Sequence, residues 1–301
     1  MTIPETVKAV FGNDYLVTSV TPVRGGTQKT VHRITCSNGF MFLHYAWDDD
    51  KNLFQEEMET SKHLFSIDSF LDNGKQIRSA GIAVPDIYYA SNETRTAFVE
   101  CITGPDFQRE LERGTEADKK KVSAEAVDVA MALHELTRKS WGTVRSPEAG
   151  SCIEPHEKEA YTNLQFISSK RKLPLSALHS RLSLLAADIE PRNNYAFVHG
   201  ELGPNHLLRS SSGEPVLIDI EGARYYDREY ELSFMSFRYP YWETPATCDQ
   251  NRFHYYLFGH HLSLAAGAIK LQERGYEDQN FARTLEAFHL KRLQHFPLLP
   301  Q

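Results

Sequence analysis

Hydrophobic and polar positions divide the chain into a β-patterned first part and a helical second part. In the first part, apolar and polar side chains alternate in short runs separated by turn residues such as Asn38-Gly39, as in strands joined by hairpins. Five runs have this pattern: 16–23, 30–37, 40–47, 87–90 and 96–102. One helix is expected after the third run, because three aspartates at 48–50 precede apolar residues at 53, 54, 58 and 64.

From residue 115 onward, apolar residues recur at spacings of three and four, which predicts amphipathic helices. The first of these helices carries Val122, Ala126, Val129 and Leu133. Further helices are predicted around 156–171, 176–189, 229–239, 250–273 and 277–293. One β-patterned stretch interrupts them, with a short strand from residue 195 and a hairpin over 206–222. No repeat or proline-rich linker separates the two parts, so we expect them to pack as one bilobal unit.

The composition is that of an ordinary globular protein, with 41% apolar and 24% charged residues among 301. This length suits one large domain or two lobes. Lys and Arg number 33 against 40 Asp and Glu, so the net charge is −7. An acidic surface disfavours nucleic acid as a partner, because the phosphate backbone selects basic proteins. A cationic small molecule or a bound metal fits the excess of acid better.

The four cysteines, Cys36, Cys101, Cys152 and Cys248, lie far apart and form no Cys-x-x-Cys pair. This spacing suggests neither a zinc site nor a disulfide framework, so we expect the reduced thiols of a cytoplasmic protein. The N-terminal residues show no secretory signal pattern. The most apolar later run, 262–269, is far shorter than the ~20 residues of a membrane span, so no membrane association is expected.

Polar residues gather beside apolar runs in two neighbouring stretches, 198–208 and 215–222. The apolar runs place these residues at strand ends, where loops present side chains from a rigid base. Within the two stretches, Glu201, His206, Asp219 and Glu221 are candidates to converge. A carboxylate that orients a hydroxyl, beside groups that hold a divalent cation, is what phosphoryl transfer requires.

These stretches resemble the aminoglycoside phosphotransferase and choline kinase family, relatives of the protein kinases. In that family the catalytic loop reads His-Gly-Asp-x-x-x-x-Asn, and the metal loop reads Ile-Asp-x-Glu or Ile-Asp-Trp. The resemblance places Glu201 on the catalytic Asp and His206 on the metal-binding Asn. It places Asp219 on the magnesium Asp and Glu221 on the acid two residues later. The segment Tyr226–Leu232 is similar to the Gly-Asp-Pro-x-x-Asp-Leu segment that follows in the family.

Upstream residues extend the resemblance to the nucleotide site. Residues 23–33 are similar to the family's glycine loop, and His44 lies where its third strand carries a phosphate-binding Lys or Arg. Glu57 lies where a helix supplies the carboxylate partner of that cation, and 98–104 resemble the hinge whose backbone binds adenine. The nucleotide-binding residues implied are Gly25, Gly26, Thr27, Lys29, His44, Glu57, Glu100 and Ile102. Residues 132–136 are similar to the helix before the catalytic loop, in which His134 is expected to be structural.

Three positions depart from the family pattern. Glu201 is one methylene longer than Asp, and a misplacement of about 1 Å can cost ~100-fold in rate. His206 in place of Asn can still ligate a metal through a neutral imidazole nitrogen, although Mg²⁺ prefers oxygen. His44 is only partly charged at pH 7, so it would grip phosphates weakly. Either Lys29 or Arg33 supplies the missing charge, or both are solvated strand cations.

The resemblance implies an α+β, bilobal, protein-kinase-like fold, with an antiparallel-sheet N-lobe with one helix over 1–102 and a larger, mainly helical C-lobe over 103–301. It implies ATP- or GTP-dependent phosphorylation of a small-molecule hydroxyl with Mg²⁺. Glu201 would orient and deprotonate the acceptor, His206 and Asp219 would hold the metal, and Glu221 would hold a second ion or its water.

We expect the acceptor in a cleft of the C-lobe, beside the acids that follow Asp219 and a set of aromatic residues. An aromatic and acidic wall suits a cationic amino sugar, aminoalcohol or antibiotic, so a role in antibiotic resistance is among the expectations. The aromatic residues are Tyr239, Tyr241, Trp242, His254 and Tyr255.

Two alternative functions stay open. Glu201 and His44 together would also suit a nucleotide-binding pseudokinase that acts as a regulatory module. Transfer of a nucleotidyl group from ATP is the other. Zinc-deaminase, metalloprotease-helix and Gly-x-Ser-x-Gly patterns are incomplete or absent.

Overall fold

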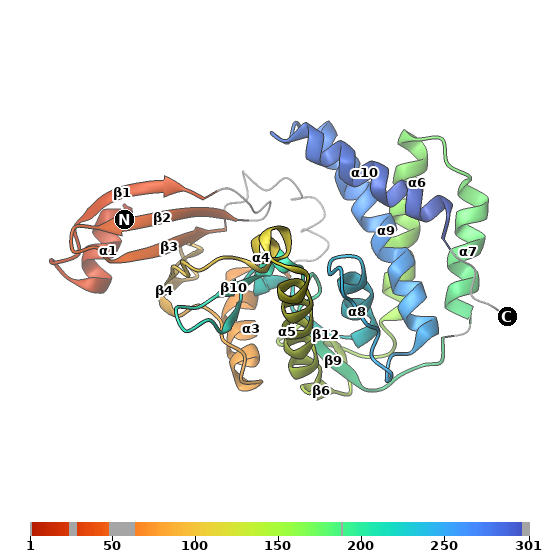
Figure 1. The fold of residues 1–301 in the computed structure, drawn as a ribbon, viewed down its shortest axis with the longest axis horizontal. Coiled ribbons are helices and arrows are strands. Elements are labelled where there is room, and N and C mark those ends of the chain that lie inside the picture. Colours follow the sequence, from red (N-terminus) through yellow and green to blue (C-terminus); the bar gives the residue numbers. More distant parts are fainter. Residues whose placement is uncertain (1, 24–28, 48–63, 188, 297–301) are drawn as a thin grey trace. The chain divides into compact units, whose positions relative to one another are not determined.

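A computed structural model describes residues 2–23, 29–47, 64–187 and 189–296 (Figure 1). The chain divides into two compact units. The first unit comprises Met1–Leu133, Thr143–Ser146 and Pro204–Arg224, and the second comprises His134–Gly142, Pro147–Gly203 and Tyr225–Gln301. The chain therefore passes between the units several times. The expected lobe boundary at residue 102 stays a prediction.

A five-stranded antiparallel sheet forms the N-terminal part of the first unit, as the alternating pattern predicts. Its strands are ordered β1-β2-β3-β5-β4. They span β1 (Val17–Pro22), β2 (Thr30–Cys36), β3 (Met41–Ala46), β4 (Ile87–Ser91) and β5 (Thr96–Glu100). In the β2–β3 register, His32 lies opposite His44.

Helix α1 (Ile3–Phe11) packs against this sheet (Figure 1). It begins at Thr2, whose side chain accepts from the backbone of Glu5 while the Glu5 carboxylate accepts from the backbone of Thr2. Such a capping box satisfies backbone donors that a helix start otherwise leaves unpaired. The apolar face of α1 buries Val7 against the sheet, next to Phe42.

The first unit includes three helices that the sequence pattern does not predict: α1, α3 (Ile67–Ser79) and α4 (Phe107–Arg113). The expected helix over 48–64 lies outside the described residues except for its last position. The hairpin predicted over 206–222 is confirmed, and its second strand forms a bridge from Val216 to Ala83. The other elements are α5 (Glu116–His134), η2 (Pro204–His206), β10 (Leu207–Arg209), β11 (Pro215–Leu217) and η3 (Ile220–Gly222).

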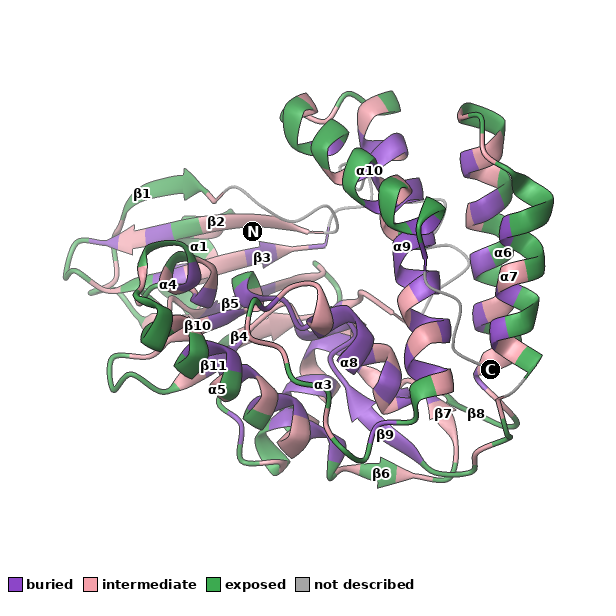
Figure 2. Ribbon diagram, turned by 45° about the vertical axis from the view of Figure 1, so that its right-hand side comes forward, coloured by how far each residue is buried: buried purple, intermediate pink, exposed green. Residues whose placement is uncertain are grey.

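The second unit is mainly helical, and its predicted helices are all confirmed with ends shifted by a few residues at most. They are α6 (Ile153–Lys170), α7 (Leu175–Ala187), α8 (Arg228–Ser236), α9 (Gln250–Glu273) and α10 (Gln279–Gln294). Helix α9 contacts each of the other four and is buried over most of its length (Figure 2). Its apolar residues therefore form the centre of this helical core.

A small sheet, ordered β6-β9-β12-β7-β8, accompanies these helices. Its strand β9 (Tyr195–Val198), which lies between β6 and β12, is buried and leads directly into the loop that carries Glu201. The other strands are β6 (Thr137–Arg138), β7 (Trp141–Gly142), β8 (Pro147–Glu148) and β12 (Arg224–Tyr226). The protein thus has an α+β fold, with an N-terminal antiparallel sheet and a mainly helical C-terminal part.

All four cysteines are free thiols, as the sequence predicts. Among the described residues, no helix has both the length and the apolar character needed to cross a membrane.

Candidate active site

The ammonium group of Lys29 lies between the carboxylates of Asp219 and Glu221 in the first unit. Its Nζ is 2.6 Å from Asp219 Oδ1 and 2.7 Å from Glu221 Oε1. Lys29 immediately precedes β2, whereas the two acids follow β11, about 190 residues later in the chain. The Lys29 and Glu221 side chains are 9% and 3% exposed, and Asp219 is 38% exposed. The structure therefore brings Lys29 together with two acids that the sequence analysis had already grouped with each other.

Burial and charge act in opposite directions in this cluster. Burial alone would lower the pKa of Lys29, but the charges of Asp219 and Glu221 raise it above its ordinary value. Burial raises the pKa of Glu221, and the Lys29 ammonium opposes that rise. Burial also raises the pKa of Tyr45 to about 12, so its ring lies beside Lys29 Nζ, 5.1 Å away, as a neutral phenol. Lys29 is thus the charge that allows a buried carboxylate at Glu221.

The loop that carries the two acids has an unusual backbone, which Asn73 of α3 supports. Asp219 has a left-handed φ of 60°, a conformation that costs a non-glycine residue about 1–2 kcal/mol. The buried Asn73 Nδ2 donates to three carbonyl oxygens of the turn that follows. The acceptors are Ile220 O at 2.8 Å, Glu221 O at 3.2 Å and Ala223 O at 2.9 Å.

Gly222 closes the same turn beneath an aromatic ring. A Cβ at this position would lie 2.9 Å from Cε1 of Phe65, so a larger residue would displace the ring or the turn. The sequence analysis did not identify Asn73 or Phe65. The available signal was an Asn-Gly pair inside a helix, where both residues are poor helix formers.

His206 lies beside Asp219, and the expectation that both hold one cation stays a prediction. Its Nε2 is 3.5 Å from Asp219 Oδ2, and its carbonyl oxygen accepts from the backbone of Ile218 at 3.0 Å. Among the described residues, no group of three or more His, Cys, Asp or Glu side chains is arranged as a metal site. Proteins usually hold Mg²⁺ through one or two carboxylates together with substrate phosphates. Asp219 and Glu221 fit that donor set.

His44 does not provide a cation at the third strand. Burial, together with the facing His32, lowers the pKa of His44 to about 4, so the ring is neutral at pH 7. Its Nδ1 is buried and finds no hydrogen-bond partner among the described residues. The His44 ring instead packs edge-on against Phe98 at 5.7 Å between centroids. The positive charge next to Asp219 and Glu221 comes from Lys29.

The remaining nucleotide residues are described only in part. Gly25, Gly26, Thr27 and Glu57 lie outside the described residues. Glu100 ends β5, and its carboxylate accepts from the backbone of Asp86 at 3.1 Å. Ile102 follows β5 and is partly buried. Their roles in adenine binding stay predictions.

The second unit holds the Glu201 loop, which follows β9. Gly200 has a φ of 94°, which favours glycine, and its backbone donates to Glu231 Oε1 at 2.9 Å. Glu231 Oε2 lies 3.2 Å from His134 Nε2, and both side chains are buried. Glu201 itself is exposed. Helix α8 therefore holds this loop through the buried carboxylate of Glu231. The contact of the buried His134 with the same carboxylate agrees with the structural role predicted for this histidine.

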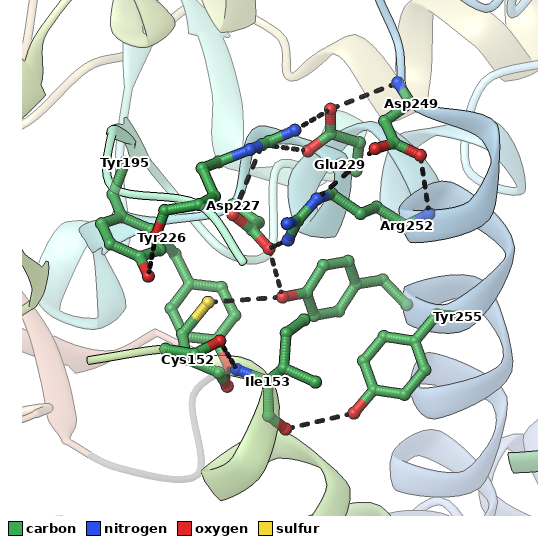
Figure 3. Close-up of polar contacts among 12 residues, drawn as sticks. Cys152, Ile153, Tyr195, Tyr226, Asp227, Glu229, Asp249, Arg252 and Tyr255 are labelled. Atoms are coloured by element: carbon green, nitrogen blue, oxygen red, sulfur yellow. Dashed lines mark hydrogen bonds and ion pairs between the residues drawn. The ribbon is translucent and has the colours of Figure 1, made fainter. Parts of the chain in front are cut away.

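The acids that follow Asp219 do not border an acceptor cleft, contrary to expectation. Asp227 and Glu229 are fully buried and pair with arginines (Figure 3). Arg192 contacts both carboxylates, and Arg252 contacts Asp227. Burial alone would raise the pKa of Glu229, but the Arg192 hydrogen bond and charge lower it. Arginines rather than a metal neutralise these acids.

The expected aromatic wall is divided between core and surface. Tyr239 and Tyr255 are buried, at 3% and 0% exposure. Tyr255 donates to Ile153 O at 3.2 Å, so it joins α9 to α6 (Figure 3). Tyr241, Trp242 and His254 are partly exposed. The two buried tyrosines are therefore core residues.

Comparison with known proteins places the chain among phosphotransferases. A family model described as the phosphotransferase enzyme family matches residues 58–266. No curated protein is significantly similar to the chain.

Several solved structures share the fold. A thermostable mutant of aminoglycoside phosphotransferase APH(4)-Ia is 15% identical, with a TM-score of 0.63 and 97% of each chain covered. The choline kinase LicA from Streptococcus pneumoniae is 14% identical, with a TM-score of 0.63 and 98% of each chain covered. A putative fructosamine-3-kinase from Thermobifida fusca is 15% identical, with a TM-score of 0.52 over 98% of this chain and 99% of that one. The expected kinase-like α+β fold is confirmed.

Proposed function

Because the chain belongs to the phosphotransferase enzyme family, we propose that it transfers the γ-phosphoryl group of ATP or GTP to a hydroxyl group of a small molecule. The observation that carries this proposal is the cluster of Lys29, Asp219 and Glu221, in which the Lys29 and Glu221 side chains are buried. A cation fixed beside two carboxylates is suited to a site where phosphates and a divalent metal meet.

In this proposal Lys29 takes the role that the family assigns to a third-strand cation. Its ammonium binds phosphate oxygens, since His44 is neutral and cannot attract them. Asp219 and Glu221 hold Mg²⁺, and the neighbouring His206 completes its protein contacts. When bound, Mg²⁺ would neutralise charge on the phosphates.

Glu201 is the proposed general base. Its carboxylate accepts the proton of the acceptor hydroxyl as that oxygen forms a bond to the γ-phosphorus, while the bond to the leaving nucleoside diphosphate breaks. Glu231 positions the loop by holding the amide of Gly200. The Glu201 side chain has one more rotatable bond than Asp, so its carboxylate has more positions available. Holding the backbone of the preceding residue reduces that number.

The similar structures guide the choice of ligands to test. APH(4)-Ia has been captured with ADP and hygromycin B, and LicA with AMP. Aminoglycosides, aminoalcohols and amino sugars therefore form the first acceptor panel. A cationic acceptor stays a prediction, because the acids Asp227 and Glu229, expected to attract one, are paired with arginines.

The test is mass identification of the product formed from ATP or GTP, Mg²⁺ and each acceptor. The proposal expects an acceptor that gains one phosphoryl group, and loss of that product in Asp219→Asn. An acceptor that gains a nucleotidyl group would establish the other transfer reaction. Nucleotide binding without turnover across the whole panel would favour the pseudokinase alternative.

A further inference from the structure

We propose that Lys29 and the divalent metal compete for the same carboxylates, so that the metal binds weakly until nucleotide phosphates draw Lys29 away. This inference rests on the proposed function, because it takes Asp219 and Glu221 as metal ligands and Lys29 as a phosphate contact. The inference goes beyond that function because it proposes that the position of the Lys29 side chain controls how tightly the metal binds.

The geometry of the three side chains carries the argument. Lys29 Nζ contacts Asp219 Oδ1 at 2.6 Å and Glu221 Oε1 at 2.7 Å. These are short, charge-assisted hydrogen bonds, and they use one oxygen from each acid. A metal held by these same two oxygens would occupy the position where the ammonium now lies. Both cations cannot occupy that position together.

Burial makes the competition strong. The Lys29 and Glu221 side chains are 9% and 3% exposed, so their charges are poorly screened by water. Two carboxylates carry two negative charges, and the ammonium already neutralises one. A divalent ion that approaches the two carboxylates therefore finds the position between them occupied by the Lys29 ammonium, and the positive charge of that group repels it.

Bound phosphates would give the Lys29 ammonium an alternative set of negatively charged partners. Its side chain lies 5.1 Å from the ring centre of Tyr45, and a flexible four-carbon stem lets the ammonium move without moving the strand. Phosphate oxygens offer it new charged partners while the metal takes the carboxylates. Arg33, the other candidate cation, is exposed on β2. Lys29 is therefore the residue that exchanges.

His206 would not be displaced by this exchange. It lies near the second oxygen of Asp219, Oδ2, whereas Lys29 contacts Oδ1. The imidazole can thus stay beside Asp219 while the cation on the other oxygen changes. The competition involves Lys29 alone among these neighbours of the two acids.

The experiment measures Mn²⁺ binding to the full chain without nucleotide, by electron paramagnetic resonance of the free ion. Mn²⁺ reports on the site because carboxylates bind it as they bind Mg²⁺. Lys29→Met should bind Mn²⁺ at least about tenfold more tightly than the unsubstituted protein, because the competing charge is gone. Lys29→Arg keeps the charge and should stay near the unsubstituted value. Lys75→Met, which removes an exposed lysine of α3, should do the same.

Equal or weaker Mn²⁺ binding by Lys29→Met would overturn the inference, and so would absence of Mn²⁺ binding in every variant. Should Lys29→Met be unstable without metal, Mn²⁺ should raise its Tm more than that of the unsubstituted protein; an equal rise contradicts the competition. ATP turnover by the unsubstituted protein is measured separately. A protein that binds Mn²⁺ as predicted but transfers no phosphoryl group refutes the proposed function and leaves the competition standing.

Discussion

Glu231 accepts a hydrogen bond at 2.9 Å from the backbone amide of Gly200, the residue before the proposed base Glu201. The bond joins a buried residue of α8 to the loop that follows β9. The other carboxylate oxygen of Glu231 lies 3.2 Å from Nε2 of the buried His134. The backbone next to the proposed base is thus held from inside the second unit.

We therefore expect Glu231→Gln to lower kcat by about tenfold or more, with a smaller change in the KM for ATP. The neutral amide binds Gly200 less strongly than a carboxylate does, and a small shift of Glu201 is costly in rate. Steady-state kinetics measure both constants. The same substitution at the exposed Glu135 is the control. A Glu231→Gln variant with kcat within twofold of the original would show that this bond does not position the loop.

Asn73 should have a comparable role in the acidic loop of the first unit. Asn73→Asp replaces a donor to three carbonyl oxygens with a negative charge of the same size. We expect unfolding free energy to fall by about 1–3 kcal/mol and Mn²⁺ affinity to fall with it, because the carbonyls lose their partner. Urea titration and Mn²⁺ binding test this, with the exposed Asn193→Asp as control. Unchanged Mn²⁺ affinity would argue against support of the loop by Asn73.

A buried histidine pair in the second unit predicts loss of stability in mild acid. His261 Nδ1 and His289 Nδ1 are 2.9 Å apart, and both side chains are buried. Burial, with neighbouring positive charges, lowers the pKa of His261 to about 3 and that of His289 to about 4. In the unfolded chain these histidines bind protons below their ordinary pKa of 6.5. In the folded protein they stay neutral until the pH falls to about 4.

Stability should accordingly be intact above pH 6.5 and fall as the pH drops toward 4, by up to about 1.4 kcal/mol per pH unit for each histidine. Urea unfolding at several pH values measures the slope. The double variant His261→Leu/His289→Phe should have a smaller slope of stability against pH. The control His179→Gln, at an exposed position, should leave the slope unchanged. A double variant with the original slope would place the acid sensitivity elsewhere.

Long periodic elements could be predicted closely from the sequence, and short or interrupted ones could not. Helix α9 begins and ends where its pattern predicts, because apolar residues repeat along all of Gln250–Glu273. Helix α3 was missed because Asn73 and Gly74 interrupt it with turn-forming residues. The two-residue strands β6, β7 and β8 exist only through pairing with distant segments, so they leave little local signal.

Motif spacing located the acidic loop but not the partners of its residues. The resemblance indicated Asp219, Glu221 and His206 and offered Lys29 as one of two replacement cations; the contacts favour Lys29. The partners of Asp227 and Glu229 come from Arg192 and Arg252, which no motif links to them. Such pairings depend on packing between distant elements, which local pattern does not encode.

The central claim is that Lys29, and not His44, supplies the phosphate-binding charge next to Asp219 and Glu221. It is tested most directly by kcat/KM for ATP in Lys29→Met and His44→Leu, at saturating Mg²⁺ and acceptor, with Lys75→Met as control. The account predicts a loss of about 100-fold or more in Lys29→Met, typical of removing a group that stabilises transition-state charge. It predicts His44→Leu within about threefold of the unsubstituted protein, because that imidazole is already neutral. A large loss in His44→Leu with little loss in Lys29→Met would contradict it.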